Sequence, residues 1–287
     1  MKSNMGDIRL GRKNVLTVVK KVDFGYYLDG GVVDGEVLLP NGEIMDDVEI
    51  VVGEEIECFV YLDTEERLVA TTRTPLAQVG DFAYLHVAWV NNFGAFLDWG
   101  LMKDLFVPFR EQKMKMQKGN GYIVHIHLDE QSHRIMASAK VERYLSDNYP
   151  PYNIGDEVEI LVWQKTELGM KVIVDNKFAG LLYDSQIFRS LHTGDRTVAY
   201  ISQVRPDGKI DLRLQRIGMK AVADFSDTLL SHLKMNGGFS PLGDKSPAEE
   251  IYALFGVSKK VFKKALGDLY RRRLIEILPD GIKLAVQ

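Results

Sequence analysis

The chain repeats one pattern three times, and this internal repeat constrains the fold more than any other sequence feature. In each copy a glycine opens an apolar segment, and a second glycine follows 14 residues later. The pairs are Gly11 and Gly25, Gly80 and Gly94, and Gly155 and Gly169. A middle segment, a further glycine with an alternating segment, and a short closing segment then follow in the same order. Because the complete ordered set recurs, we predict three copies of one small domain.

Each copy has the composition of a small all-β domain. About five short segments alternate apolar and polar residues within ~65–70 residues, separated by Gly, Asp and Asn. Such alternation predicts strands, and five short strands predict a small barrel or sandwich. A closed five-stranded barrel of the OB type removes exposed strand edges and presents one face to oligonucleotides.

The end of the chain changes to helical periodicity. Apolar residues at Val222, Phe225, Leu229, Leu230 and Leu233 have the spacing of one helix face, and Asn236-Gly237-Gly238 ends that helix. Ser246-Pro247-Ala248-Glu249 matches a capping box, which predicts a second helix from Ala248 to about Phe255. Ser258 is predicted to cap a third helix that runs to about Arg273. Its predicted buried face consists of Val261, Phe262, Ala265, Leu266 and Leu269.

Pro279-Asp280-Gly281 lies between two short apolar segments and predicts a hairpin. Three helices followed by a hairpin make a winged helix. We therefore expect a mainly β protein with three five-stranded barrels followed by an α+β winged-helix domain. The predicted domains are 1–74, 75–146, 147–216 and 217–287.

The repeated order of motifs resembles the S1 domain, an RNA-binding module of the OB fold. The resemblance covers roughly residues 8–216. The second repeat matches it best, with Phe93-Gly94-Ala95-Phe96-Leu97, and the first reads Phe24-Gly25-Tyr26-Tyr27-Leu28. The third repeat reads Leu168-Gly169-Met170-Lys171-Val172 and has lost both aromatics. S1 domains usually have a histidine after the middle strand, where this chain has Pro40, Pro108 and Tyr183.

The resemblance implies that aromatic rings of the first two repeats stack on unpaired bases. The rings in question are Phe24, Tyr27, Phe93 and Phe96. Two such residues lie three positions apart, so strict alternation would place them on opposite faces of a strand. We expect the intervening glycine to introduce a bulge or twist that brings them together, with at least one ring exposed in each repeat. Burial of these rings in the barrel core is the alternative.

Basic residues near the same face are candidates for phosphate contact. They are Arg73, Lys103, Arg110 and Lys140. Taken singly, each is more simply an ordinary solvated charge. The third repeat keeps only Lys171, Tyr183 and Arg213, so we expect it to be mainly structural or to contact a different ligand.

The third predicted helix is strongly basic. It carries Lys259, Lys260, Lys263, Lys264, Arg271, Arg272 and Arg273. In a helix-turn-helix this is the recognition helix, and its first half enters a groove of the nucleic acid. Basic residues near a helix C-terminus also complement the helix dipole, but seven cations exceed that requirement. Phosphate contact is therefore the predicted role.

Charge is distributed unevenly along the chain. Residues 216–287 carry 12 Lys and Arg against 8 Asp and Glu, whereas residues 1–215 carry 24 against 32. The acidic part is poorly suited to tight binding through phosphate charge alone, but aromatic stacking on single strands remains open to it. The absence of an apolar run of about 20 residues or a leader-type segment, together with a single cysteine, Cys58, favours a cytoplasmic protein without membrane association.

Three S1-like barrels followed by a winged helix are similar to the conserved virulence factor B family. The resemblance extends over nearly the whole chain and implies an RNA-binding regulator that acts on gene expression, most simply through single-stranded RNA. A DNA-binding transcriptional regulator acting through the winged helix is the alternative, and a scaffold for protein partners is a further one.

An enzyme is not expected. His125 and His127 alternate on a predicted strand with His133 beyond a turn, which resembles part of a metal site. Surface strand histidines are the favoured interpretation, because no carboxylate or thiolate has a ligand-like spacing. The sequence contains no motif of the common nucleotide-binding or hydrolytic sites, so no cofactor, metal or catalytic residue is predicted.

Overall fold

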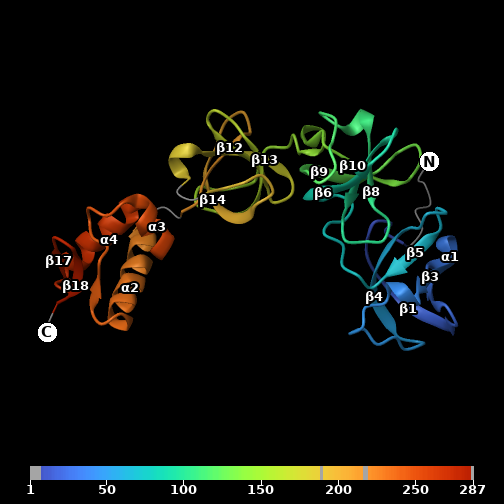
Figure 1. The fold of residues 1–287 in the computed structure, drawn as a ribbon, viewed down its shortest axis with the longest axis horizontal. Helices are drawn as coiled ribbons and strands as arrows, with labels where there is room; N and C mark the ends of the chain where they lie inside the picture. The colour runs from blue at the N-terminus through green and yellow to red at the C-terminus, as the bar shows by residue number, and fades with distance from the viewer. Residues whose placement is uncertain (1–7, 188–189, 216–218, 286–287) are drawn as a thin grey trace. The chain divides into compact units, whose positions relative to one another are not determined.

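The computed structural model describes residues 8–187, 190–215 and 219–285 (Figure 1). The predicted repeat forms three closed barrels of five strands, which confirms the predicted fold class. The first barrel, barrel 1, runs in the order β1-β2-β3-β5-β4. Its strands are β1 (Arg12–Val22), β2 (Gly25–Asp29), β3 (Glu36–Pro40), β4 (Glu55–Leu62) and β5 (Leu68–Thr71), with a short helix α1 (Gly31–Asp34) and a 3₁₀ turn η1 (Asn41–Glu43).

Barrels 2 and 3 repeat this order of strands. Barrel 2 consists of β6 (Phe82–Val90), β7 (Gly94–Asp98), β8 (Leu105–Pro108), β9 (Gly121–Leu128) and β10 (Ile135–Ser138), with η2 (Phe109–Glu111) and η3 (Val141–Tyr144). Barrel 3 consists of β11 (Glu157–Lys165), β12 (Gly169–Val174), β13 (Phe178–Tyr183), β14 (Arg196–Val204) and β15 (Ile210–Arg213), with η4 (Asp184–Gln186). In each barrel the third strand pairs in parallel with the fifth, and the other pairs are antiparallel.

The second glycine of each repeat stands where no side chain fits. A Cβ at Gly25, Gly94 or Gly169 would come within 2.2 Å of a backbone carbonyl oxygen of the neighbouring strand. The residues paired with these glycines are Pro40, Pro108 and Tyr183. The close approach of two backbones explains why the repeat keeps a glycine at this point.

The first strand of every barrel carries a register shift at the same point of the repeat. The shifts lie between Val18 and Lys20, between Val87 and Trp89, and between Val162 and Gln164. A bulge adds one residue to the alternation, so side chains beyond it change face. Alternation with the buried Leu85 and Val87 would place Trp89 inside barrel 2, but its side chain is 42% exposed.

Barrel 1 has a hydrophobic core of its own, and some of its residues also join the core of barrel 2. Phe59 of β4 packs edge-on against Trp99, with ring centroids 5.7 Å apart, and both side chains are buried. Ala77, in the connection between the barrels, belongs to the same buried cluster. The connection is also tied by the backbone, because the Leu76 amide donates to the Trp99 carbonyl at 2.8 Å. Shared burial of this kind makes the two barrels one compact body.

The C-terminal part is a winged helix, as predicted. Its elements are α2 (Met219–Met235), β16 (Phe239–Ser240), α3 (Ala248–Phe255), α4 (Lys259–Arg271), β17 (Ile275–Leu278) and β18 (Gly281–Leu284). Residues 275–284 form the expected hairpin, and β16 adds a third strand that the sequence did not predict, in the order β16-β18-β17. Of the predicted buried faces, Phe225, Leu229 and Leu233 are buried in α2, as are Phe262, Ala265, Leu266 and Leu269 in α4. The side chain of Val222 lies outside the described part.

Two local predictions for this region are wrong. Ser246 does not cap the second helix, because α3 begins at Ala248 and Pro247 is its N-cap without a side-chain bond. The Ser246 hydroxyl instead accepts from the Gly243 amide in the preceding loop, at 2.9 Å. The third helix ends at Arg271 rather than Arg273, because Arg273 adopts a left-handed backbone with φ of 58°. The Ser258 cap is confirmed, with its hydroxyl accepting from the Val261 amide at 3.3 Å.

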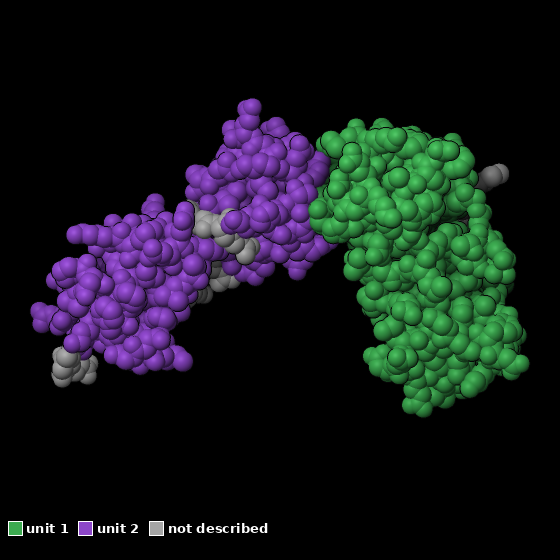
Figure 2. Space-filling model, in the orientation of Figure 1, with its two compact units in different colours: residues 1–145 green, residues 146–287 purple. Residues whose placement is uncertain are grey.

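The chain divides into two compact units, residues 1–145 and 146–287 (Figure 2). The first holds barrels 1 and 2, and the second holds barrel 3 and the winged helix. The predicted limits of the four domains stay a prediction, and the limit at 216/217 lies outside the described residues.

Candidate nucleic-acid interface

In barrel 1 the glycine before β2 brings its two aromatic neighbours together. The rings of Phe24 and Tyr27 meet edge to face with centroids 6.4 Å apart. Phe24 is 56% exposed, and the Lys20 ammonium lies 4.6 Å from the centre of the Tyr27 ring. The predicted exposure of one ring is confirmed here, and the pair forms a small platform with a cation on one side.

Barrel 2 has a larger aromatic surface at the same place. Trp89 and Phe96 are paired across β6 and β7 and stack in parallel, with centroids 3.7 Å apart. Phe106 of β8 packs on Phe96 at 4.9 Å, and Phe93 before β7 is 74% exposed. We call Trp89, Phe93, Phe96 and Phe106 the aromatic platform. Exposed aromatic surface of this size on a rigid sheet is suited to stacking on flat ligands.

The sequence patterns did not identify Trp89 and Phe106 as candidate site residues. The signal for Phe106 was present, because it alternates with buried residues along β8. Trp89 carried no such signal, since its exposure depends on the register shift in β6. Its indole is held in place by a hydrogen bond from Nε1 to Asp104 Oδ2, at 2.7 Å.

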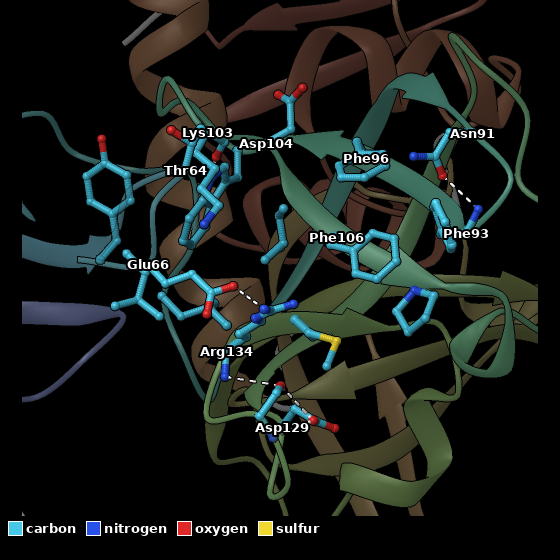
Figure 3. A pocket seen from close by; sticks show the side chains of 18 of the residues that line it. Thr64, Glu66, Asn91, Phe93, Phe96, Lys103, Asp104, Phe106, Asp129 and Arg134 are labelled. Atoms are coloured by element: carbon cyan, nitrogen blue, oxygen red, sulfur yellow. Dashed lines mark hydrogen bonds and ion pairs between the residues drawn. The ribbon is translucent and has the colours of Figure 1, made fainter. Parts of the chain in front are cut away.

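A groove of about 1030 Å³ runs along the platform (Figure 3). Barrel 2 supplies most of its lining, and barrel 1 supplies Tyr61 and Leu62 from the end of β4 and Thr64 and Glu66 from the turn between β4 and β5. The two barrels are connected at this point. The Lys103 ammonium donates to the Asp63 carbonyl at 2.6 Å, and Arg134 forms an ion pair with Glu66. The groove is therefore a joint product of barrels 1 and 2.

The predicted basic residues of the barrels fall into two groups. Lys103 and Arg110 line the groove, together with Arg134, which was not predicted. Arg110 pairs with Asp129 at 3.0 Å, and burial lowers the pKa of the Lys103 ammonium.

The other two predicted basic residues are not among the side chains that line the groove. Arg73 donates to the Gly42 carbonyl at 3.2 Å and lies 3.8 Å from Glu43, and Lys140 donates to the Arg110 carbonyl. Both are thus engaged in local contacts of their own barrels.

In the winged helix, α4 presents its basic side chains to solvent. Lys260, Lys263, Lys264 and Arg271 are exposed, whereas Lys259 is half-buried beside the Lys245 carbonyl. Arg272 caps the helix C-terminus and pairs with Asp268 at 3.3 Å. The apolar side of α4 packs in the domain core, so the basic side is the one available to a partner.

The chain matches two family models, the S1 domain over residues 10–73 and the CvfB-like winged helix domain over residues 227–284. It is 25% identical over 283 residues to conserved virulence factor B of Staphylococcus aureus, covering 96% of this chain and 94% of the relative. Over nearly its whole length the chain is similar to conserved virulence factor B. It is also 28% identical over 272 residues to the uncharacterized protein YitL of Bacillus subtilis, with 92% and 90% of the two chains covered.

A solved structure is similar to the chain over most of its length. It is a multidomain protein with nucleic acid binding domains from Streptococcus pneumoniae, 25% identical, with 96% of this chain and 98% of that chain covered and a TM-score of 0.41. The S1 and winged-helix domains support nucleic-acid binding. No helix in the described ranges combines the length and apolar character needed to cross a membrane.

Two of the three histidines singled out in the sequence, His125 and His127, are packed against an aromatic ring. His125 is buried, and the Tyr144 ring of η3 stacks on it at 4.0 Å and also contacts His127 at 5.1 Å. The expectation of surface strand histidines is therefore wrong for His125, because η3 covers this part of β9. Burial lowers the pKa of His125 to about 4. In the part of the chain that the structure describes, no three His, Cys, Asp or Glu side chains gather as a metal-binding group.

Among the described residues of barrel 3, no aromatic platform lies at the equivalent place. Leu168 is exposed where the other barrels have Phe24 and Phe93, and the Lys171 ammonium lies 5.5 Å from the Trp163 ring. The polar residues that this repeat keeps are used internally. Arg205 donates to the Tyr183 hydroxyl at 2.7 Å, and the buried Arg213 donates to the Ile201 carbonyl at 2.9 Å.

Proposed function

We propose that the protein binds single-stranded RNA and regulates gene expression after transcription, in the cytoplasm and without catalysing a reaction. Bases stack on the aromatic platform of barrel 2 and on Phe24 and Tyr27 of barrel 1. The basic side of α4 contacts phosphates. The proposal rests on the S1 and winged-helix domains and on the similarity to conserved virulence factor B.

The observation that carries the proposal is the parallel stack of Trp89 and Phe96 beside the exposed Phe93 ring, in an open groove. Every base has a flat π-face, so an aromatic platform binds single strands with little demand on sequence. In a duplex the bases are stacked on each other and their faces are covered. The groove is therefore suited to unpaired nucleotides.

The charge of the groove lining is balanced. Lys103 and Arg110 line the groove. Arg73 and Lys140 do not line it, and their contact with phosphate remains a prediction. The acidic side chains of the groove, Glu66, Asp104 and Asp129, equal its cations in number, and Glu66 and Asp129 pair with Arg134 and Arg110. Affinity in barrels 1 and 2 then comes mainly from stacking and depends weakly on salt, whereas contacts from α4 depend on salt more strongly.

The test is the affinity of the full chain for a labelled single-stranded RNA of about ten nucleotides, a length within the range of one OB-type site. Phe93→Ala is expected to weaken binding by about 5-fold to 150-fold, the equivalent of one lost base stack of about 1–3 kcal/mol. Leu168→Ala is the matched control, because Leu168 occupies the same position of the third repeat and is also exposed. Equal affinities of wild type and Phe93→Ala would refute the stacking proposal.

A DNA-binding function through the winged helix is a second candidate, favoured by the exposed cations of α4. Lys263→Gln with Lys264→Gln removes two of them without touching the core. The DNA-binding function would be favoured if the full chain bound duplex DNA more tightly than single-stranded RNA. The double variant should then lose this preference, and Phe93→Ala should keep it. The opposite order of affinities would support RNA.

A further inference from the structure

A polar side chain, Asn91, stands at the edge of the aromatic platform. It lies between β6 and β7, where its backbone amide donates to the Gly94 carbonyl at 3.0 Å and closes a tight turn. Its side-chain oxygen accepts from the backbone amides of Phe93 and Gly94, at 2.8 and 3.1 Å. These bonds hold the side chain in one position beside the rings.

The two bonds also decide which way the side-chain amide faces. Because Oδ1 accepts from two backbone N–H groups, the other end of the amide must be the nitrogen. Nδ2 donates to no acceptor among the described residues. Asn91 lines the groove, and in Figure 3 its nitrogen is turned to the side of Phe96 while its oxygen faces the backbone of Phe93. The groove therefore receives two fixed N–H donors from a side chain that offers it no acceptor.

We propose that Asn91 reads the edge of the base held on the platform and selects bases with a carbonyl oxygen there, uracil above adenine. The inference rests on the proposed function, since it needs a stacked base. Uracil carries two carbonyl oxygens that can accept from the donors of Asn91. Adenine has no carbonyl oxygen and accepts only through ring nitrogens, and its exocyclic amino group is a donor that opposes those of Asn91. Single-stranded RNA is read along such base edges once the bases are splayed out and stacked.

The other two barrels have no amide side chain at this position. Val22 of repeat 1 and Thr166 of repeat 3 occupy the position of Asn91, counted from the first glycine of each repeat. Valine has no polar side-chain atom, and the Thr166 hydroxyl donates to the Gly169 carbonyl at 2.8 Å. Among the three copies, base selection by an amide at this position belongs to barrel 2.

The matched variants are Asn91→Asp, Asn91→Ser and Asn92→Asp in the full chain. Aspartate keeps an oxygen for both backbone amides and preserves the turn, but it replaces the donor by an acceptor. Serine also suits the turn and removes the amide without adding charge. Asn92→Asp places the same new charge one residue away, on an exposed side chain that is not among those lining the groove.

The measurement is the ratio of affinities for oligouridine and oligoadenosine of about ten nucleotides. Wild type is expected to favour uridine, and Asn91→Asp and Asn91→Ser to lower the ratio by about fivefold to tenfold, the effect of one net hydrogen bond. Asn92→Asp is expected to leave the ratio unchanged, although its charge weakens both affinities.

A wild type without preference for uridine, or an unchanged ratio in both Asn91 variants, would overturn the role of Asn91. If Phe93→Ala still weakened the binding of both oligomers in that case, the proposed function would stand without a role for Asn91. If Phe93→Ala had no effect on either oligomer, the proposed function would fail, and the inference with it.

Discussion

The indole of Trp89 lies flat on the ring of Phe96, with the two planes 3° from parallel. The pair bridges neighbouring strands β6 and β7, and the bond from Trp89 Nε1 to Asp104 fixes the outer edge of the indole. Because these rings are ordered before any ligand arrives, binding need not immobilise them, which lowers the entropic cost of stacking.

The exposure of Trp89 makes it an internal reporter. The protein has three tryptophans, and Trp99 and Trp163 are only 2% and 8% exposed against 42% for Trp89. Single-stranded RNA is expected to quench the tryptophan emission, because a base stacked on the platform contacts the indole of Trp89, whereas Trp99 lines the groove but is almost fully buried. In Trp89→Phe the quench should disappear while binding followed by labelled RNA persists. A full quench in that variant would place the RNA elsewhere on the molecule.

The contact between Lys103 and the Asp63 carbonyl predicts a stabilising link between barrels 1 and 2. Lys103→Met keeps the alkyl stem and removes the charged donor, so we expect a loss of about 1 kcal/mol in the free energy of unfolding. Urea denaturation measures it, with the exposed Lys115→Met as the control. Equal loss in both variants would mean that the link contributes nothing.

The buried His125 predicts a loss of stability in mild acid. Its pKa of about 4 lies below the value of about 6.5 in an unfolded chain, so the unfolded chain binds the proton first as pH falls. The contribution is complete above about pH 6.5, declines as pH falls through 4, and amounts to at most about 3 kcal/mol. His127, whose pKa is also lowered by burial, acts in the same direction.

Urea midpoints at about pH 7.5, 6 and 4.5 measure this decline. His125→Gln is expected to flatten the profile over this range, since glutamine does not titrate. His133→Asn is the control, because His133 is exposed in a turn with φ of 55°, which asparagine tolerates. Identical profiles for wild type and His125→Gln would contradict the assignment.

Two glycines of the winged helix are expected to respond to alanine with opposite signs. A Cβ at either Gly267 or Gly256 meets nothing within 4 Å, so space decides neither case. Gly267 lies inside α4, and Gly267→Ala should stabilise the domain by about 0.5–1 kcal/mol. Gly256 ends α3 with a left-handed φ of 67°, and Gly256→Ala should destabilise it by about 1–2 kcal/mol. Urea denaturation distinguishes the signs, and a loss of stability in Gly267→Ala would show that α4 requires the glycine.

Much of the fold follows from local pattern. The spacing of Gly11 and Gly25 and its two repetitions predicted the three barrels, and the buried positions of α4 were predicted from their helical period. Ser258 was also identified correctly as a cap, because capping depends on a few neighbouring residues. The Ser246 prediction failed because its hydroxyl accepts from the Gly243 amide of the preceding loop, a contact on which the motif does not report.

The sequence by itself determined the number of barrels, the winged helix and the exposure of one aromatic ring in each of the first two repeats. Tertiary structure decided the composition of the candidate site. The register shift in β6 turned Trp89 outward, and η3 covered His125. The shared core around Phe59 and Trp99 brought the turn of barrel 1 to the groove of barrel 2. Each of these depends on contacts between residues far apart in the chain, whereas strand and helix patterns report only on neighbours.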